Sequence, residues 1–215
     1  MTRDPYRHTA TRYDRYVDPL IAGLRRIGRR LYRPRKGMQV LDVGCGTGTA
    51  LKFYRDAGCR VAGLDCSPAM AAAARQKLGP RAAICLGDGA RMPYPDNRFD
   101  LVTGWLTLHE MPAAVRPMVL AEMVRVTRDT GRILLVDYRA GAVRTITGRL
   151  GRLPILFFEI MAGRNHFRHY RDFLRRGGLQ PLIIGAQLTV ERQTSAVGGN
   201  FRLTLLRLDR PVPMA

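Results

Sequence analysis

The chain is poor in long apolar runs and in cysteine, and both shortages limit what it can be. Its 215 residues contain no apolar stretch near the roughly 20 residues that a membrane-spanning helix needs. The first residues, MTRDPYRHTATRYDRY, hold no apolar signal core. The four cysteines show no C-x-x-C spacing, which argues against a zinc ribbon or a thioredoxin-type site. We therefore expect a soluble, cytoplasmic protein without a bound metal.

Lysine is scarce as well, so the positive charge of the chain comes from arginine. The formal net charge is +19, yet only three residues are lysines. A GC-rich genome produces such a bias, but it should spread the excess evenly. Instead residues 1–36 hold eleven basic residues against three acids and residues 139–177 hold nine against two, whereas residues 37–138 hold twelve against ten. The two basic segments favour an anionic partner, either a lipid surface, an acidic substrate or nucleic acid.

The first two thirds of the chain alternate between short apolar runs and helical patterns. Strands are expected at 38–43, 60–65, 82–87, 99–104 and 131–138, and helices at 50–58, 67–79 and about 113–127. Ser67 followed by Pro68 is typical of a helix start, and Gly79 of a helix end. Strands that alternate with helices indicate a parallel sheet with helices on both faces.

The pattern changes after residue 138. Residues 141–163 read as a basic helix or broken helix with an apolar end, and residues 166–179 as a helix. The runs 181–190 and 201–208 are expected to be strands, joined by a glycine-containing turn that leaves no room for a crossover helix. This last pair should therefore be antiparallel.

A glycine-rich turn follows the first expected strand. Gly44, Gly46 and Gly48 alternate with other residues directly after Asp42. Glycine in a regular element costs about 0.5–1 kcal/mol relative to alanine, so such a cluster indicates that a ligand approaches the backbone at a helix N-terminus. The dinucleotide fingerprint G-x-G-x-x-G requires glycine where Thr49 stands, and this difference argues against a dehydrogenase.

Carboxylates also follow the next two strands. Asp65 ends the second strand, where it can accept both ribose hydroxyls of an adenosine, and Asp88 follows the third, where it can take an adenine amino group. The carboxyl ends of neighbouring parallel strands meet at one crevice. The three features together predict a nucleoside site there.

Four stretches of the chain resemble motifs of the class I S-adenosylmethionine-dependent methyltransferases: VLDVGCGTG, GLDCSPAM, GDGARMPYPDNRFD and RVTRDTGRILLVDY. Residues 10 to 138 resemble in particular the small-molecule and lipid methyltransferases of the menaquinone/ubiquinone methylase type. The resemblance implies an α/β fold with a doubly wound, Rossmann-like sheet of seven strands and an antiparallel last strand. We expect one domain, made of an N-terminal helical lid (1–36), a cofactor-binding core (37–138), a helical insert on the acceptor side (139–179) and a C-terminal strand pair (180–215).

The resemblance also implies S-adenosyl-L-methionine as the cofactor and S-adenosyl-L-homocysteine as its product. By position, Asp42 would lie near the methionine moiety, Asp65 at the ribose, Met70 and Asp88 at the adenine, and Trp105 beside the methyl group. The expected cofactor-binding residues are Asp42, Gly44, Cys45, Gly46, Gly48, Asp65, Cys66, Met70, Asp88, Gly89 and Trp105.

Catalysis by such an enzyme consists mainly of alignment, because a sulfonium methyl group is already electrophilic. Proximity and orientation can supply about 7–11 kcal/mol of the barrier, and a general base matters only if the acceptor loses a proton. The expected catalytic residues are Tyr13, His109 and Tyr170, with His166 and His169 as alternative bases. The stretch WLTLHEMP resembles the family's Leu-His-His-Leu-Pro element, but Glu110 stands where a second histidine often does, which weakens the assignment of His109.

The prediction of the methyl acceptor depends on the stretch RLGRLPILFFEIMAGRNHFR, where arginines flank an apolar patch. This stretch can lie on an anionic membrane, wall an apolar pocket or pack as core. We expect a small apolar or lipid-like acceptor (a quinone or phospholipid), peripheral contact with the inner membrane surface, and a monomer or homodimer. A nucleic-acid methyltransferase is an alternative, but the Asn/Asp-Pro-Pro-Tyr and Pro-Cys elements and an RNA-binding module are missing. A non-catalytic cofactor-binding protein is the other alternative.

Overall fold

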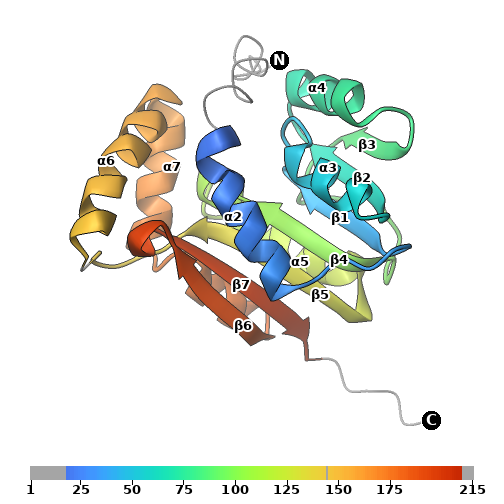
Figure 1. Ribbon diagram of the computed structural model, residues 1–215. Helices are drawn as coiled ribbons and strands as arrows, with labels where there is room; N and C mark the ends of the chain where they lie inside the picture. The colour runs from blue at the N-terminus through green and yellow to red at the C-terminus, as the bar shows by residue number, and fades with distance from the viewer. Residues whose placement is uncertain (1–17, 144, 210–215) are drawn as a thin grey trace.

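Seven strands form one sheet in the part of the chain that the computed structural model describes, residues 18–143 and 145–209 (Figure 1). The strands are β1 Gln39–Val43, β2 Arg60–Asp65, β3 Ala82–Leu86, β4 Phe99–Trp105, β5 Thr127–Tyr138, β6 Leu188–Ala196 and β7 Phe201–Leu208. Their order across the sheet is β3-β2-β1-β4-β5-β7-β6. Strands β1 to β5 pair in parallel, and β7 runs antiparallel to both β5 and β6. The expected doubly wound sheet with an antiparallel last strand is confirmed.

Helices cover both faces of this sheet (Figure 1). They are α2 Asp18–Leu31, α3 Thr49–Asp56, α4 Pro68–Leu78, α5 Val115–Val126, α6 Ile146–Met161, α7 Arg164–Arg175 and α8 Leu179–Gly185, with short 3-10 turns η1 Leu108–Glu110 and η2 Val197–Gly199. Helix α4 begins as its sequence predicts, because the Ser67 hydroxyl accepts a hydrogen bond from the Met70 backbone N–H at 3.1 Å. None of the described helices is long and apolar enough to cross a membrane.

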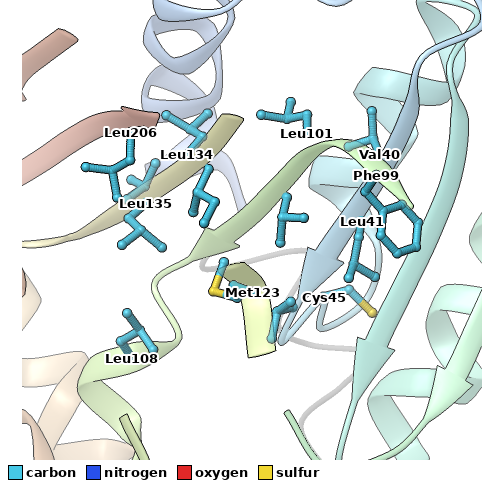
Figure 2. Packing of buried hydrophobic residues seen from close by; sticks show 14 of the residues in the cluster. Val40, Leu41, Cys45, Phe99, Leu101, Leu108, Met123, Leu134, Leu135 and Leu206 are labelled. Carbon is cyan, nitrogen blue, oxygen red and sulfur yellow. The ribbon is translucent and has the colours of Figure 1, made fainter. Parts of the chain in front are cut away.

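The core lies on both sides of the central strands (Figure 2). Val40 and Leu41 are neighbours on β1 and point to opposite faces, yet both are fully buried. Leu101 of β4 and Leu134 of β5 are buried as completely, and Met123 of α5 packs on the other face of the sheet, on the side of Leu135. Burial of both faces explains why these strands read as continuous apolar runs.

The prediction of a strand over residues 181–190 is wrong in its first half. Helix α8 occupies Leu179–Gly185, and β6 begins only at Leu188. The helix buries Leu179 and Ile183, which lie four residues apart and therefore on one helical face. An apolar run this short does not distinguish helix from strand. The antiparallel pairing of β6 with β7 across η2 is as expected.

The segments on either side of the core are helical. Residues 146–161 form one helix, α6, which continues through Pro154 rather than breaking there. Near the N-terminus, α2 packs against β5, β6 and β7, and Figure 1 shows it crossing the sheet. The remainder of the expected N-terminal lid, residues 1–17, lies outside the described residues.

Candidate active site

A cleft of about 830 Å³ lies at the carboxyl ends of β1, β2, β3 and β4. Parallel α/β sheets bind their ligands at this edge. Its lining includes eight of the expected cofactor residues: Gly44, Gly46, Asp65, Cys66, Met70, Asp88, Gly89 and Trp105. A second hollow, of about 650 Å³, is lined by Arg55, Arg60 and neighbouring residues at the amino end of β2, and it contains none of the expected site residues.

In the glycine turn after β1, Gly44 and Gly46 are required for different reasons. Gly44 has a φ of +68°, and a Cβ there would lie 2.0 Å from Oγ1 of Thr107, so a side chain would collide with the opposite wall. Gly46 has a φ of +53°, but a Cβ there would meet no atom within 4 Å. Packing therefore does not require glycine at Gly46. The open space beside it belongs to the cleft, which is what close approach of a ligand to the backbone requires.

Asp65 fastens this turn to the start of α4. Its Oδ2 accepts a hydrogen bond from the Gly46 backbone N–H at 2.8 Å, and its Oδ1 accepts one from the Ser67 N–H at 2.9 Å. A carboxylate oxygen can accept more than one hydrogen bond. Asp65 therefore fits the role of a ribose ligand while it also holds the loop in shape.

The expected adenine residues surround the same end of the cleft. Met70 is buried and presents an apolar side chain, while Asp88 is exposed and accepts a hydrogen bond from the Ala90 N–H at 2.9 Å. Cys66 lines the cleft as a neutral thiol, because burial and then the charge of Asp65 raise its pKa. These residues combine an apolar surface with a carboxylate, a suitable pair for a purine ring with an amino group.

Three of the expected cofactor residues do not line the cleft. Gly48 faces α4, since a Cβ there would lie 2.8 Å from Leu78, and Cys45 is buried in the core. Asp42 is also buried, and its Oδ1 accepts a hydrogen bond from the Thr103 hydroxyl at 2.6 Å. Burial raises the pKa of Asp42 to about 8, against the lowering effect of the Thr103 hydrogen bond and with a further contribution from the charge of Asp65. Asp42 therefore has a structural role: it links β1 to β4 beneath the glycine turn and does not face the cleft.

The end of β4 closes another side of the cleft. Gly28 of α2 packs against the ring of Trp105 so closely that a Cβ would lie 2.5 Å from it. The buried indole N–H of Trp105 has no hydrogen-bond partner among the described residues. The next residue, Leu106, has a φ of +54°, an unfavourable conformation for a branched side chain. Such strain is typical of functional sites.

The two expected catalytic residues that the structure describes do not line the cleft. His109 and Tyr170 are both buried and absent from its lining, and Tyr13 lies outside the described residues. Nδ1 of His109 lies 2.8 Å from Oδ1 of Asp137. Burial lowers the pKa of His109, but the charge and hydrogen bond of Asp137 and the charge of Glu159 outweigh burial and raise it to about 9.

Two histidines of α7 line the cleft instead, and both were alternatives in the sequence. Nδ1 of His169 lies 2.8 Å from the backbone carbonyl of Glu110. A carbonyl only accepts hydrogen bonds, so Nδ1 carries the proton in the neutral ring and Nε2 keeps its lone pair. Nε2 of His166 lies 2.9 Å from Oε2 of Glu159. Each ring thus has one nitrogen held by the protein.

Sequence reasoning missed the residues that hold this wall together. Arg116 is buried and donates to the carbonyls of Leu108 and His169 and to the carboxylate of Asp172, which connects α5 to η1 and α7. Glu159 is buried as well, and its signal was a single acid inside the apolar run PILFFEIM. Asp137, near the carboxyl end of β5, follows the same rule as Asp65 and could have been found by it.

Comparison with known proteins agrees with this geometry. Residues 40–131 match the family described as methyltransferase domain. The chain is 37% identical over 133 residues to a demethylmenaquinone methyltransferase of Beutenbergia cavernae, covering 60% of this chain and 54% of that protein. It is 37% identical over 137 residues to a malonyl-[acyl-carrier protein] O-methyltransferase of Serratia marcescens, covering 60% and 51%. The chain spans about half the length of the curated relatives that it matches.

The fold has solved counterparts. A SAM-dependent methyltransferase from Aquifex aeolicus superposes with a TM-score of 0.64 at 19% identity, over 92% of this chain and 97% of that one. The strand order and the cleft at the strand ends agree with these matches. Residues 40–131 match a methyltransferase domain, the chain is similar in sequence to the demethylmenaquinone methyltransferases, and its fold is that of the S-adenosylmethionine-dependent methyltransferases.

Proposed function

We propose that this chain transfers a methyl group from S-adenosylmethionine to a small apolar acceptor of the quinone or lipid class, which reaches the cleft from an anionic membrane surface. The observation that carries the proposal is the position of the cleft beside an exposed apolar helix with basic flanks. Residues 162–166, which follow directly on α6, line the cleft. Relatives named demethylmenaquinone methyltransferase and ubiquinone/menaquinone biosynthesis C-methyltransferase support a quinone-type acceptor.

The residues present fit the cofactor. Gly46 leaves open space at the backbone, Asp65 offers carboxylate oxygens for a ribose, and Asp88 with Met70 suits an adenine. Held by these residues, the cofactor would supply an electrophilic methyl group for transfer to the acceptor. The protein contributes alignment and exclusion of water, which can supply about 7–11 kcal/mol. Where the acceptor carries an acidic proton, the lone pair on Nε2 of His169, a residue that lines the cleft, can accept that proton.

Helix α6 presents a continuous apolar stripe to the outside. Ile146, Leu150, Leu153, Phe157 and Ile160 recur at spacings of three and four, so they share one face of the helix. Leu153 is 65% exposed and Phe157 60% exposed. Figure 1 shows α6 at the outer edge of the molecule, beside α7. An exposed stripe of this size marks a surface that contacts another apolar body.

Arginines surround this stripe. Arg149 lies on α6, Arg164 and Arg168 lie at the start of α7, and all three are exposed. An apolar helical face with basic neighbours suits the interface of an anionic bilayer, where each basic residue contributes up to about 1 kcal/mol. Charge complementarity therefore favours an anionic lipid surface over a neutral apolar partner. An apolar acceptor dissolved in that bilayer would enter the cleft past residues 162–166.

Sedimentation with liposomes tests the membrane part of the proposal. We expect the chain to bind phosphatidylglycerol vesicles at low salt, to bind them less at high salt, and to bind phosphatidylcholine vesicles weakly. The double variant Leu153→Ser/Phe157→Ser should lose binding. Met118→Ser is the matched control, because Met118 is an exposed apolar residue (54%) on α5, away from α6. Equal sedimentation of all variants, or none at low salt, would contradict the membrane contact.

Transfer of a labelled methyl group tests the reaction itself. The chain is incubated with methyl-labelled S-adenosylmethionine and either a demethylated quinone or a phospholipid in vesicles, and the organic extract is counted. Label in the quinone extract that depends on Asp65 would support the proposal. Cofactor binding without transfer to any apolar acceptor would favour a non-catalytic binding protein, and label in added RNA would favour the nucleic-acid alternative.

A further inference from the structure

A buried cluster of donor atoms lies behind the acceptor side of the cleft. It consists of His109 from η1, Glu159 from α6 and His166 from α7, and one donor atom of each lies within 4.8 Å of the other two. His109 and Glu159 are almost fully buried, while His166 lines the cleft. Two imidazoles and one carboxylate form a donor set that binds Zn²⁺ in proteins.

The spacing within the cluster matches that of metal ligands. Oε2 of Glu159 lies 2.9 Å from Nε2 of His166, and Oε1 lies 3.7 Å from Nε2 of His109. The second distance is too long for a hydrogen bond. Two donors that each lie about 2.1 Å from a tetrahedral zinc ion are about 3.4 Å apart. The two observed separations fall on either side of this value, and each carboxylate oxygen faces a different imidazole.

Neighbouring groups orient the donors as they do around bound metals. Nδ1 of His109 lies 2.8 Å from Oδ1 of Asp137, so the ring donates its Nδ1 proton there and directs Nε2, the nitrogen whose proton a metal would replace, toward Glu159. Oδ2 of Asp137 accepts from the backbone N–H groups of Leu108 and His109 and is thereby fixed. The Tyr138 hydroxyl donates to Oε1 of Glu159 at 2.8 Å. A ligating histidine held by a carboxylate, and a ligating carboxylate held by a hydrogen bond, are regular features of metal sites.

We propose that His109, Glu159 and His166 bind one zinc ion at the wall of the cleft. No motif in the sequence indicates this site, because its ligands come from three separate segments and lack a metal-binding spacing. Glu159 in the cluster and Asp137 beside it place two carboxylates around two imidazoles, and a divalent cation would balance their charge.

The position of the ion gives it a further role. His166 lies both in the cluster and in the lining of the cleft, so an acceptor oxygen that enters beside it could complete the coordination. Zinc lowers the pKa of bound water to about 7, and it would lower the pKa of an acceptor hydroxyl in the same sense. This role rests on the proposed methyl transfer, whereas metal binding itself does not.

Metal titration tests the site without an acceptor or a cofactor. The tag-free chain is stripped with a chelator and titrated calorimetrically with Zn²⁺, and its thermal midpoint is recorded with and without the metal. We expect one zinc per chain and a higher midpoint with zinc. Glu159→Gln and His166→Ala should each weaken binding by more than about a hundredfold, because even residues that only support a ligand are worth about 10–100-fold. His169→Ala is the matched control, one turn further along α7 and in the same cleft, and should bind as the wild type does.

Two results would overturn the proposal. One is the absence of stoichiometric zinc binding by the folded wild-type chain. The other is binding that Glu159→Gln and His166→Ala both retain, which would place the metal elsewhere. Anomalous diffraction at the zinc edge from wild-type crystals locates the ion independently of any variant. Because the titration contains neither acceptor nor cofactor, failure of methyl transfer and failure of metal binding are separate outcomes.

Discussion

The substitution Gly46→Ala tests whether glycine is needed at this position for cofactor binding or for folding. Gly46 has a φ of +53°, and its missing Cβ would meet no protein atom within 4 Å. The substitution therefore adds only the strain of a left-handed alanine, about 1–2 kcal/mol of unfolding free energy. The new methyl group points into the space that we assign to S-adenosylmethionine. Extra methyl groups in packed sites cost about 1–3 kcal/mol, so cofactor affinity should fall about 5- to 150-fold.

Gly37→Ala is the matched control for this experiment. Gly37 also has a positive φ, +86°, and also meets nothing within 4 Å, but it precedes β1 at the end of the sheet opposite the cleft. The two variants should lose similar stability in urea denaturation. Only Gly46→Ala should bind S-adenosylhomocysteine more weakly in a calorimetric titration. Equal affinity in both variants would refute the claim that the cofactor approaches the backbone at Gly46.

Three more substitutions test other parts of the account. Asp65→Ala should weaken S-adenosylhomocysteine binding about 10- to 100-fold in calorimetry, because a hydrogen bond to a charged group contributes about 1.5–3 kcal/mol; unchanged binding would remove the ribose assignment. Arg116→Met should lower the free energy of unfolding in urea by about 1–3 kcal/mol, since two backbone carbonyls and Asp172 lose a buried donor, although Asp172 keeps Arg176; a loss below about 1 kcal/mol would contradict the structural role. Asp42 keeps its proton in the folded state up to about pH 8 but loses it near 3.8 when unfolded, so the folded state binds more protons between these values. The unfolding free energy should therefore fall as pH rises from about 4 to 8, and Asp42→Asn should remove that fall; the same slope in both proteins would count against the raised pKa.

The cofactor half of the molecule was predictable because its determinants are local in sequence. The Ser67–Pro68 helix start, the glycine turn and the acid at Asp65 each act within a few residues of their own strand. The parallel topology then brings the strand ends together without further information. Helix α8 was missed because three apolar residues between a proline and a glycine fit either period.

The acceptor half could not be predicted in the same way. Its polar residues come together only when η1, β5, α6 and α7 pack against one another, and no local spacing in the sequence predicts these contacts. They are His109, Asp137, Glu159 and His166. Tyr170 was among the expected catalytic residues, but its ring packs against Tyr138 in the interior. A pattern of period 3.6 identifies the buried face of a helix, but it does not say which polar group that face will contact.

A crystal structure of the chain with S-adenosylhomocysteine tests the central claim most directly. The account predicts the adenosine between Asp65 and Asp88, the ribose hydroxyls on the Asp65 carboxylate, and the amino-acid end over Gly44 and Gly46. The sulfur should face the part of the cleft that His166 lines. Density for the ligand outside this cleft, or a ribose without contact to Asp65, would contradict it.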